Sequence, residues 1–188
     1  MANELKGKRV AFLFTDGAEQ AEVTEPLEAV RRAGADVDII SLEEGEVEMW
    51  KHFDKGDKIA ANKGVSDADP SDYDGLVLPG GVANPDQLRL NKDAVKFVRT
   101  FFEQDKPGGV ICHGPWMLVE TGVAKGRKVT SWPSLQTDLR NAGAEWVDEE
   151  VVVDNGLVTS RKPEDLPAFC AKVVEEIAEG KHKQRVAA

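Results

Sequence analysis

Short apolar runs alternate with helical patterns along most of this chain, and that alternation restricts its fold more than any other feature. Four apolar runs have the length and continuity of buried strands, and each is bounded by Gly, Pro or Asp. They are Val10 to Phe14, Val37 to Ser41, Leu76 to Leu78 and Val110 to Cys112. Helical spacing of apolar residues fills 22–33 and 93–104. Continuous apolar strands separated by amphipathic helices are typical of a parallel sheet covered on both faces. The sequence therefore predicts an α/β fold, a doubly wound sandwich with mainly parallel strands.

The remaining segments extend this pattern with less regular spacing. Further helices are predicted over 115–121, 134–141 and 164–179, and further strands over 128–131, 150–153 and 157–160. Residues 43–72 are polar, and their glycine spacing indicates a hairpin and loops rather than a crossover helix. A chain of 188 residues is long enough for one sizeable core, and no repeat or linker divides it. We therefore expect a single domain over 1–188.

The composition argues against several classes of partner. A net charge of −10 disfavours a nucleic-acid surface, where clustered Lys and Arg would have to meet phosphate. No apolar run approaches the roughly 20 residues of a membrane helix, and the N-terminus lacks the apolar stretch of a signal peptide. Two cysteines give no disulfide framework, which agrees with a reducing compartment. We expect a cytoplasmic protein with neither nucleic acid nor membrane as a partner.

The two cysteines occupy different sequence contexts. Cys170 lies on an apolar helix face, where a thiol packs as a small hydrophobic group. Cys112 instead ends a predicted central strand, the edge at which open α/β sheets bind ligands, and a helix follows from about Pro115. The amino end of that helix favours a thiolate. The residues alone thus favour a functional Cys112, with a buried structural thiol as the alternative.

The sequence contains none of the common metal or nucleotide motifs. We find no HExxH, CxxC, GxxxxGK[ST] or GxGxxG pattern, and His52 and His182 have no partners at ligand spacing. Neither a metal site nor a bound cofactor is expected.

Two motifs carry a resemblance to a known family. Leu78-Pro79-Gly80-Gly81 and Ile111-Cys112-His113-Gly114-Pro115, with Ala18 to Glu22 after the first strand, resemble the ThiJ/PfpI superfamily, which includes the PfpI intracellular proteases. The resemblance covers nearly the whole chain. It implies a flavodoxin-like fold close to the class I glutamine amidotransferases, Cys112 as the reactive thiol of a nucleophile elbow, and a homodimer or larger oligomer.

The resemblance also assigns roles to residues around Cys112. Glu19 falls where the family keeps a glutamate in contact with the sulfur, and we expect it to be protonated because two adjacent anions would repel. In family peptidases, a carboxylate from a neighbouring subunit contacts this histidine and completes a catalytic triad. Asp86 is the candidate for that contact with His113, although a Glu would be expected at its position. The amides of Gly81 and His113 are the expected oxyanion donors, beside Gly80. Apart from the resemblance, Trp116 and Trp132 are candidates for the pocket mouth or a subunit contact, with a core or boundary position as the alternative.

Two functional classes follow from these assignments. The first is a stress-protective enzyme whose Cys112 attacks a small electrophilic carbonyl, as a deglycase or glyoxalase-like enzyme, or an acyl group, as a PfpI-type cysteine peptidase or hydrolase. Asp86 in place of Glu favours the carbonyl chemistry. The second is an oxidative-stress sensor or holdase chaperone that uses an oxidisable Cys112. Peptidase, deglycase and sensor remain open from the sequence, as do the substrate and the size of the oligomer.

Overall fold

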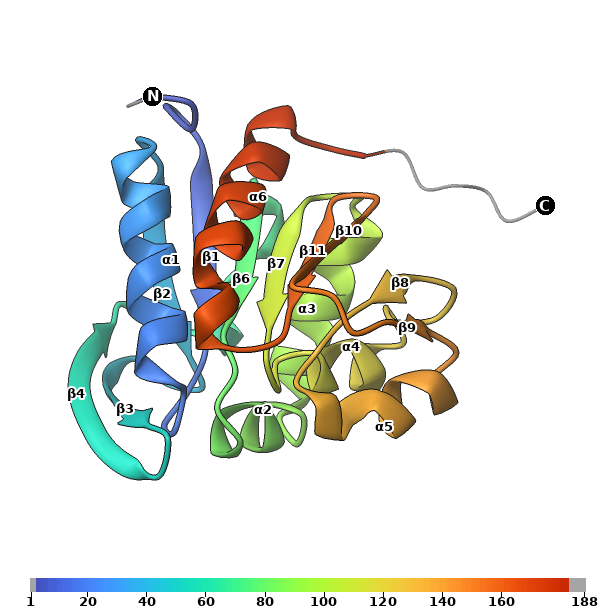
Figure 1. Ribbon diagram of the computed structural model, residues 1–188. Coiled ribbons are helices and arrows are strands. Elements are labelled where there is room, and N and C mark those ends of the chain that lie inside the picture. The colour runs from blue at the N-terminus through green and yellow to red at the C-terminus, as the bar shows by residue number, and fades with distance from the viewer. Residues whose placement is uncertain (1–2, 183–188) are drawn as a thin grey trace.

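A seven-stranded sheet forms the centre of the computed structural model, which describes residues 3–182 (Figure 1). Its strand order is β10-β11-β7-β6-β1-β2-β5. The strands are β1 (Arg9–Leu13), β2 (Asp36–Ser41), β5 (Lys63–Gly64), β6 (Gly75–Leu78), β7 (Gly108–Ile111), β10 (Val151–Asp154) and β11 (Leu157–Ser160). All neighbours pair in parallel except β10 and β11, which form an antiparallel hairpin at the edge. The predicted mainly parallel sheet is confirmed.

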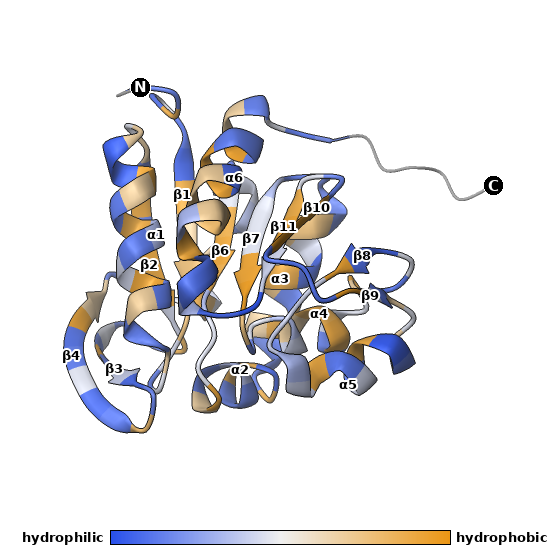
Figure 2. Cartoon of the chain, in the orientation of Figure 1, coloured by the Kyte–Doolittle hydropathy of each residue, from blue (hydrophilic) through white to orange (hydrophobic). Residues whose placement is uncertain are grey.

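Helices cover both faces of the sheet, as Figure 1 shows. One face carries α1 (Gln20–Arg32) and α6 (Leu166–Glu179), and the other carries α3 (Lys92–Glu103), α4 (Trp116–Thr121) and α5 (Gln136–Asn141). Side chains of one strand alternate between two cores: Phe12 packs with the α1 and α6 side, and Leu13 with the opposite side. The sheet strands are accordingly the most hydrophobic part of the chain (Figure 2). This arrangement confirms the doubly wound α/β sandwich.

The polar segment between β2 and β6 contains the predicted hairpin. Strands β3 (Gly45–Lys51) and β4 (Asp54–Ala61) pair in antiparallel fashion outside the main sheet. The hairpin is attached to the start of α1, because the N–H of Trp50 donates to the carbonyl of Ala18 over 2.8 Å. The tip of the hairpin therefore lies beside the carboxyl end of the central strands.

Some short elements differ from the expectations. Asp86 lies in the short helix α2 (Ala83–Leu88), which the helical pattern did not predict, and β8 (Lys128–Val129) pairs with β9 (Glu145–Trp146) in a separate small sheet. Single 3-10 turns occupy Val65–Asp67, Pro70–Asp72, Pro133–Leu135 and Pro163–Asp165. The buried Asn84 fixes α2 by donating to the carbonyls of Pro79 and Gly80. Six residues with one proline give too little periodicity to identify such a helix.

No helix within residues 3–182 combines the length and the apolar character that a bilayer crossing requires.

Truncation of a core aromatic residue should destabilise the protein strongly. Phe101 on α3 is fully buried, so Phe101→Ala should lower the free energy of unfolding by about 3–5 kcal/mol. Phe53 is 88% exposed, and Phe53→Ala should change it by no more than about 0.5 kcal/mol. Urea unfolding of both variants measures the difference. Equal effects would contradict the assigned core.

Candidate active site

Cys112 lies in a strained turn directly after β7. Its φ is 63°, a left-handed value that non-glycine residues seldom adopt. Hydrogen bonds hold the residue on both sides: its N–H donates to the carbonyl of Ser160, and its carbonyl accepts from the N–H of Trp132. Such strain persists only where the surroundings fix it, and it is common at functional sites. The turn matches the predicted nucleophile elbow in position.

The carboxyl group beside the sulfur is that of Glu22, and not that of Glu19 as the sequence suggested. Glu22 lies in the first turn of α1, is fully buried, and forms a side-chain hydrogen bond with Cys112. Its Oε2 accepts from the N–H of Gly80 over 2.8 Å, whereas its Oε1 has no hydrogen-bond partner among the described residues. Glu19 faces the hairpin instead, where its Oε2 accepts from the N–H of His52 over 2.9 Å. The expected pairing of Glu19 with Cys112 is therefore wrong, and the glutamate about one helical turn further along the chain takes that place.

Two glycines allow this close packing. A Cβ at Gly80 would lie 2.6 Å from both the Cβ of Cys112 and the Oε2 of Glu22. Gly81 has a φ of 76°, and a Cβ there would collide with the carbonyl oxygen of Gly17. Only glycine fits either position, because no other residue leaves this space free. The N–H of Gly80 is occupied by Glu22, so Gly80 does not serve as an oxyanion donor.

Burial determines where the proton sits in the pair of Glu22 and Cys112. Burial raises the pKa of Glu22 from 4.5 to about 8, so this carboxyl is protonated at neutral pH. Burial also raises the pKa of the Cys112 thiol, and an ionised Glu22 would raise it further. The amides of Gly81 and His113 hydrogen-bond to the sulfur and lower that pKa. Cys112 as a residue is only 7% exposed, so the structure contradicts the exposed, low-pKa thiol that the sequence suggested. The thiol is buried, and its charge depends on these donors.

His113 is buried between two tryptophan rings. Trp132 stacks on it with ring centroids 5.9 Å apart, and Trp116 contacts it edge to face at 5.3 Å. Burial lowers the pKa of His113 to about 4, so the imidazole is neutral at pH 7. Its Nδ1 lies 3.2 Å from the sulfur of Cys112. A neutral ring at this distance can accept the thiol proton.

Two of the other predicted residues lie away from the sulfur. Trp116 donates its Nε1–H to Asp138 and is not among the residues that line the pocket, whereas Trp132, the other tryptophan candidate, does line it. Asp86 is exposed on α2 and makes no contact with His113 within residues 3–182. Because its predicted contact crosses a subunit interface, that pairing stays a prediction.

A pocket of about 430 Å³ opens above the sulfur. Cys112, His113, Glu22 and Gly81 lie at its base, and the rim is formed by Glu19, His52, Phe53, Val82, Trp132, Lys162, Pro163 and Glu164. Three rim side chains are apolar and exposed, at 88% for Phe53, 51% for Val82 and 39% for Trp132. The pocket thus has a reactive thiol at its floor and a partly apolar entrance.

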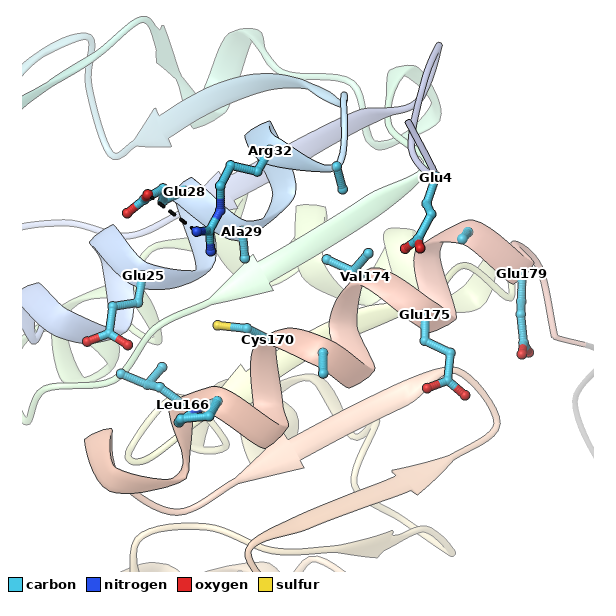
Figure 3. Close-up of a pocket in the computed structure, with 14 residues that line it drawn as sticks. Glu4, Glu25, Glu28, Ala29, Arg32, Leu166, Cys170, Val174, Glu175 and Glu179 are labelled. Carbon is cyan, nitrogen blue, oxygen red and sulfur yellow. Dashed lines mark ion pairs between the residues drawn. The ribbon is translucent and has the colours of Figure 1, made fainter. Parts of the chain in front are cut away.

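A larger groove of about 1040 Å³ lies elsewhere, between α1 and α6 (Figure 3). Its side chains come from both helices, with glutamates at the rim and Cys170 in the wall. Burial raises the pKa of Cys170 to about 12, so this thiol stays protonated. Cys170 is half-buried and packs against the core, as its helix pattern predicted. Glu25 and Arg32 are near enough to influence its charge, but its sulfur makes no hydrogen bond within residues 3–182, so the groove lacks the chemistry of the Cys112 pocket.

The comparisons with known proteins agree with this geometry. The model of the DJ-1/PfpI family matches residues 8–176. The chain belongs to the DJ-1/PfpI family. The resemblance to the ThiJ/PfpI superfamily is thereby confirmed.

Relatives within the DJ-1/PfpI family differ in the activities for which they are named. The "Putative cysteine protease YraA" of Bacillus subtilis is 44% identical over 162 residues, 86% of this chain and 94% of YraA. The "Deglycase TK1284" of Thermococcus kodakarensis is 42% identical over 167 residues, 89% of this chain and 98% of that protein. The crystal structure of Drosophila melanogaster DJ-1beta has a TM-score of 0.82 at 29% identity, over 91% of this chain and 90% of that one.

One available signal would have identified Glu22 in this DJ-1/PfpI chain. The buried positions of α1 include Glu22, Pro26 and Val30, which are spaced four residues apart. Glu22 therefore shares the helix stripe that faces the sheet. Glu19 is the N-cap residue, outside that stripe. A charged residue within an apolar helix stripe is the sequence signal that distinguishes Glu22 from Glu19.

The Glu22 carboxyl should control how thiol reactivity depends on pH. Above about pH 8, Glu22 ionises, and its charge opposes formation of the neighbouring thiolate. Glu22→Gln removes this charge, so its rate of alkylation at pH 9 should exceed the wild-type rate by a factor of about ten. Iodoacetamide kinetics from pH 6 to 10, in a Cys170→Ser background, measure this. Glu19→Gln is the matched control and should follow the wild-type profile; the reverse pattern would reject the assignment of Glu22.

Proposed function

We propose that this protein is a stress-protective enzyme in which Cys112 attacks small reactive carbonyl compounds or their adducts, as a deglycase or glyoxalase-like enzyme does. The convergence on one sulfur of a protonated Glu22, the neutral His113 and two backbone amides carries this proposal. These groups supply a nucleophile, a proton carrier and oxyanion donors within one pocket.

The first chemical step uses each of these groups. The Cys112 sulfur forms a bond to the carbonyl carbon, and the C=O π electron pair moves to the oxygen. The amides of Gly81 and His113 face this region and stabilise the oxygen charge. The thiol proton passes to His113 Nδ1, 3.2 Å away, and Glu22 supplies the proton that the oxygen takes. The product is a hemithioacetal, and His113 returns its proton to Glu22 through the reacting group.

The shape of the site favours a small substrate over an extended peptide. The pocket above the sulfur measures about 430 Å³, at the lower end of the range for small-ligand sites. The exposed Phe53, Val82 and Trp132 suit the apolar part of an adduct. Names of relatives support both a deglycase and a cysteine protease, so peptide hydrolysis is the competing activity on the same thiol.

The assembly and location in the cell follow as parts of the same proposal. We expect a homodimer or larger oligomer in which Asp86 of a second copy approaches His113 and orients its ring. The two cysteines are free, which fits a reducing, cytoplasmic compartment.

Reversible oxidation of Cys112 is the second candidate function. A protonated carboxyl beside the sulfur can donate a hydrogen bond to a sulfenate or sulfinate oxygen, and only Cys112 has such a neighbour among the two thiols. A 40% identical relative is named "General stress protein 18", and a solved Toxoplasma gondii DJ-1 is described as oxidized.

Substitution of Cys112 should abolish the enzyme activity. With methylglyoxal or its thiol adducts as substrate, Cys112→Ser should lower kcat/KM at least 10²-fold, because serine at this site is a far weaker nucleophile. Cys170→Ser, the matched control, should stay within about twofold of wild type. Lactate release measures the activity, with a fluorogenic peptide panel in parallel. Turnover of peptides alone would establish the competing peptidase, and equal activity of Cys112→Ser would reject both.

Mild peroxide should oxidise the two cysteines unequally if the sensor function is real. Cys112 should gain two oxygen atoms while Cys170 stays reduced, because only the sulfur of Cys112 has hydrogen-bond donors around it. Intact mass and peptide mapping measure this, and Glu22→Leu should redirect the product to further oxidation by removing the donor. Equal oxidation of both thiols, or a binding behaviour that oxidation leaves unchanged, would count against sensing.

A further inference from the structure

Three potential metal ligands meet at the carboxyl end of α6, far along the chain from Cys112. Glu176 and Glu179 lie on the last turn of the helix, and His182 follows three residues later. Gly180 ends the helix with a φ of 87°, which turns the chain so that His182 comes back beside the two glutamates. One ligand atom from each residue lies within 4.8 Å of the other two. The sequence showed no partner for His182 at ligand spacing, but the fold brings Glu176 and Glu179 to it.

The distances within this cluster suit one shared ion. The Nε2 of His182 is 3.0 Å from the Oε2 of Glu176 and 3.9 Å from the Oε2 of Glu179. Bonds of about 2.1 Å to a single zinc ion place neighbouring ligand atoms roughly 3.0–3.6 Å apart. The Glu179 side chain is 57% exposed and can close the remaining gap by rotating.

A simple hydrogen-bonded ion pair does not account for the contact between His182 and Glu176. The Oε2 of Glu176 and the Nε2 of His182 are both buried, yet neither makes a hydrogen bond among the described residues. Glu176 is only 7% exposed, so water does not replace the missing partner of this oxygen. A buried polar atom without a partner is costly, and a cation between the two atoms would satisfy both.

The fold holds His182 in place without help from a ligand. Its N–H donates to the carbonyl of Asp105 over 3.0 Å, and its ring lies against Gly156, where a Cβ would come within 2.8 Å of the His182 Cδ2. The imidazole is therefore fixed between the segment before β7 and the β10–β11 turn. A site whose ligands are already placed loses less entropy on binding.

We propose that Glu176, Glu179 and His182 bind a divalent transition-metal ion, with zinc as the best match. One imidazole and two carboxylates form a ligand set typical of zinc, whereas magnesium and calcium prefer oxygen ligands alone. A water molecule would complete the coordination. Asp105 and Gly156 precede β7 and β11, whereas Cys112 follows β7, so the site lies at the opposite edge of the sheet from the pocket. The ion acts structurally, by tying the end of α6 to the sheet.

Zinc titration of the full-length, chelator-treated protein tests the proposal. Isothermal titration calorimetry should give one ion per chain, and zinc should raise the Tm. His182→Gln and Glu176→Gln should each weaken binding at least tenfold and remove the rise in Tm. Glu175→Gln and His52→Gln are the matched controls, because both residues lie outside the cluster, and should bind as wild type does.

A Cys112→Ser variant separates this site from the thiol. It should keep the single ion, because Cys112 is not a ligand. Loss of the ion in Cys112→Ser would place the metal at the pocket and overturn the proposal. Unchanged binding in His182→Gln, or no binding by the wild type at micromolar zinc, would also overturn it and leave an ordinary ion pair at the end of α6.

Discussion

The site depends on one buried contact, between the carboxyl of Glu22 and the sulfur of Cys112. Two negative charges cannot share a space from which water is excluded, so at neutral pH at least one proton stays on the pair. Burial raises the pKa of both groups, that of the carboxyl to about 8 and that of the thiol well above its ordinary value, so the carboxyl carries its proton at neutral pH. The structure around the pair serves to bring the two groups together: the amide of Gly80 anchors the far oxygen of Glu22, and the missing side chain of Gly80 leaves room for both.

Hydrogen bonds to the sheet and to a neighbouring segment hold Cys112 in its strained conformation. A left-handed φ at a non-glycine residue costs about 1 kcal/mol or more, and the turn would relax if the chain were free. The hydrogen bonds to Ser160 and Trp132 prevent this, because they tie the residue to the end of β11 and to the segment that follows β8. The sulfur is thereby held toward the amides of Gly81 and His113, and a rigid layer of parallel strands supplies the precision that the chemistry needs.

The two glutamates at the start of α1 have separate tasks. Glu22 faces the sheet and the thiol, whereas Glu19 accepts from the backbone of His52 at the tip of the hairpin. Together with the contact between Trp50 and Ala18, this bond fixes the hairpin over the pocket entrance, where Phe53 is exposed. The first turn of α1 therefore positions both the floor of the pocket, through Glu22, and its rim, through Glu19.

Local residue patterns determined most of the fold and part of the site. Continuous apolar strands and amphipathic helices have few ways to bury themselves, so the doubly wound sheet follows from periodicity, and Cys112 at a strand end follows from the same pattern. Only the tertiary structure decided which glutamate reaches the sulfur, because Glu19 and Glu22 differ by about one helical turn, and the exact start of α1 sets which one faces inward. The pKa values of Glu22 and His113, the stacking of Trp132 on His113, and the contact of His182 with Glu176 likewise depend on burial and on contacts between distant segments, which no local pattern encodes.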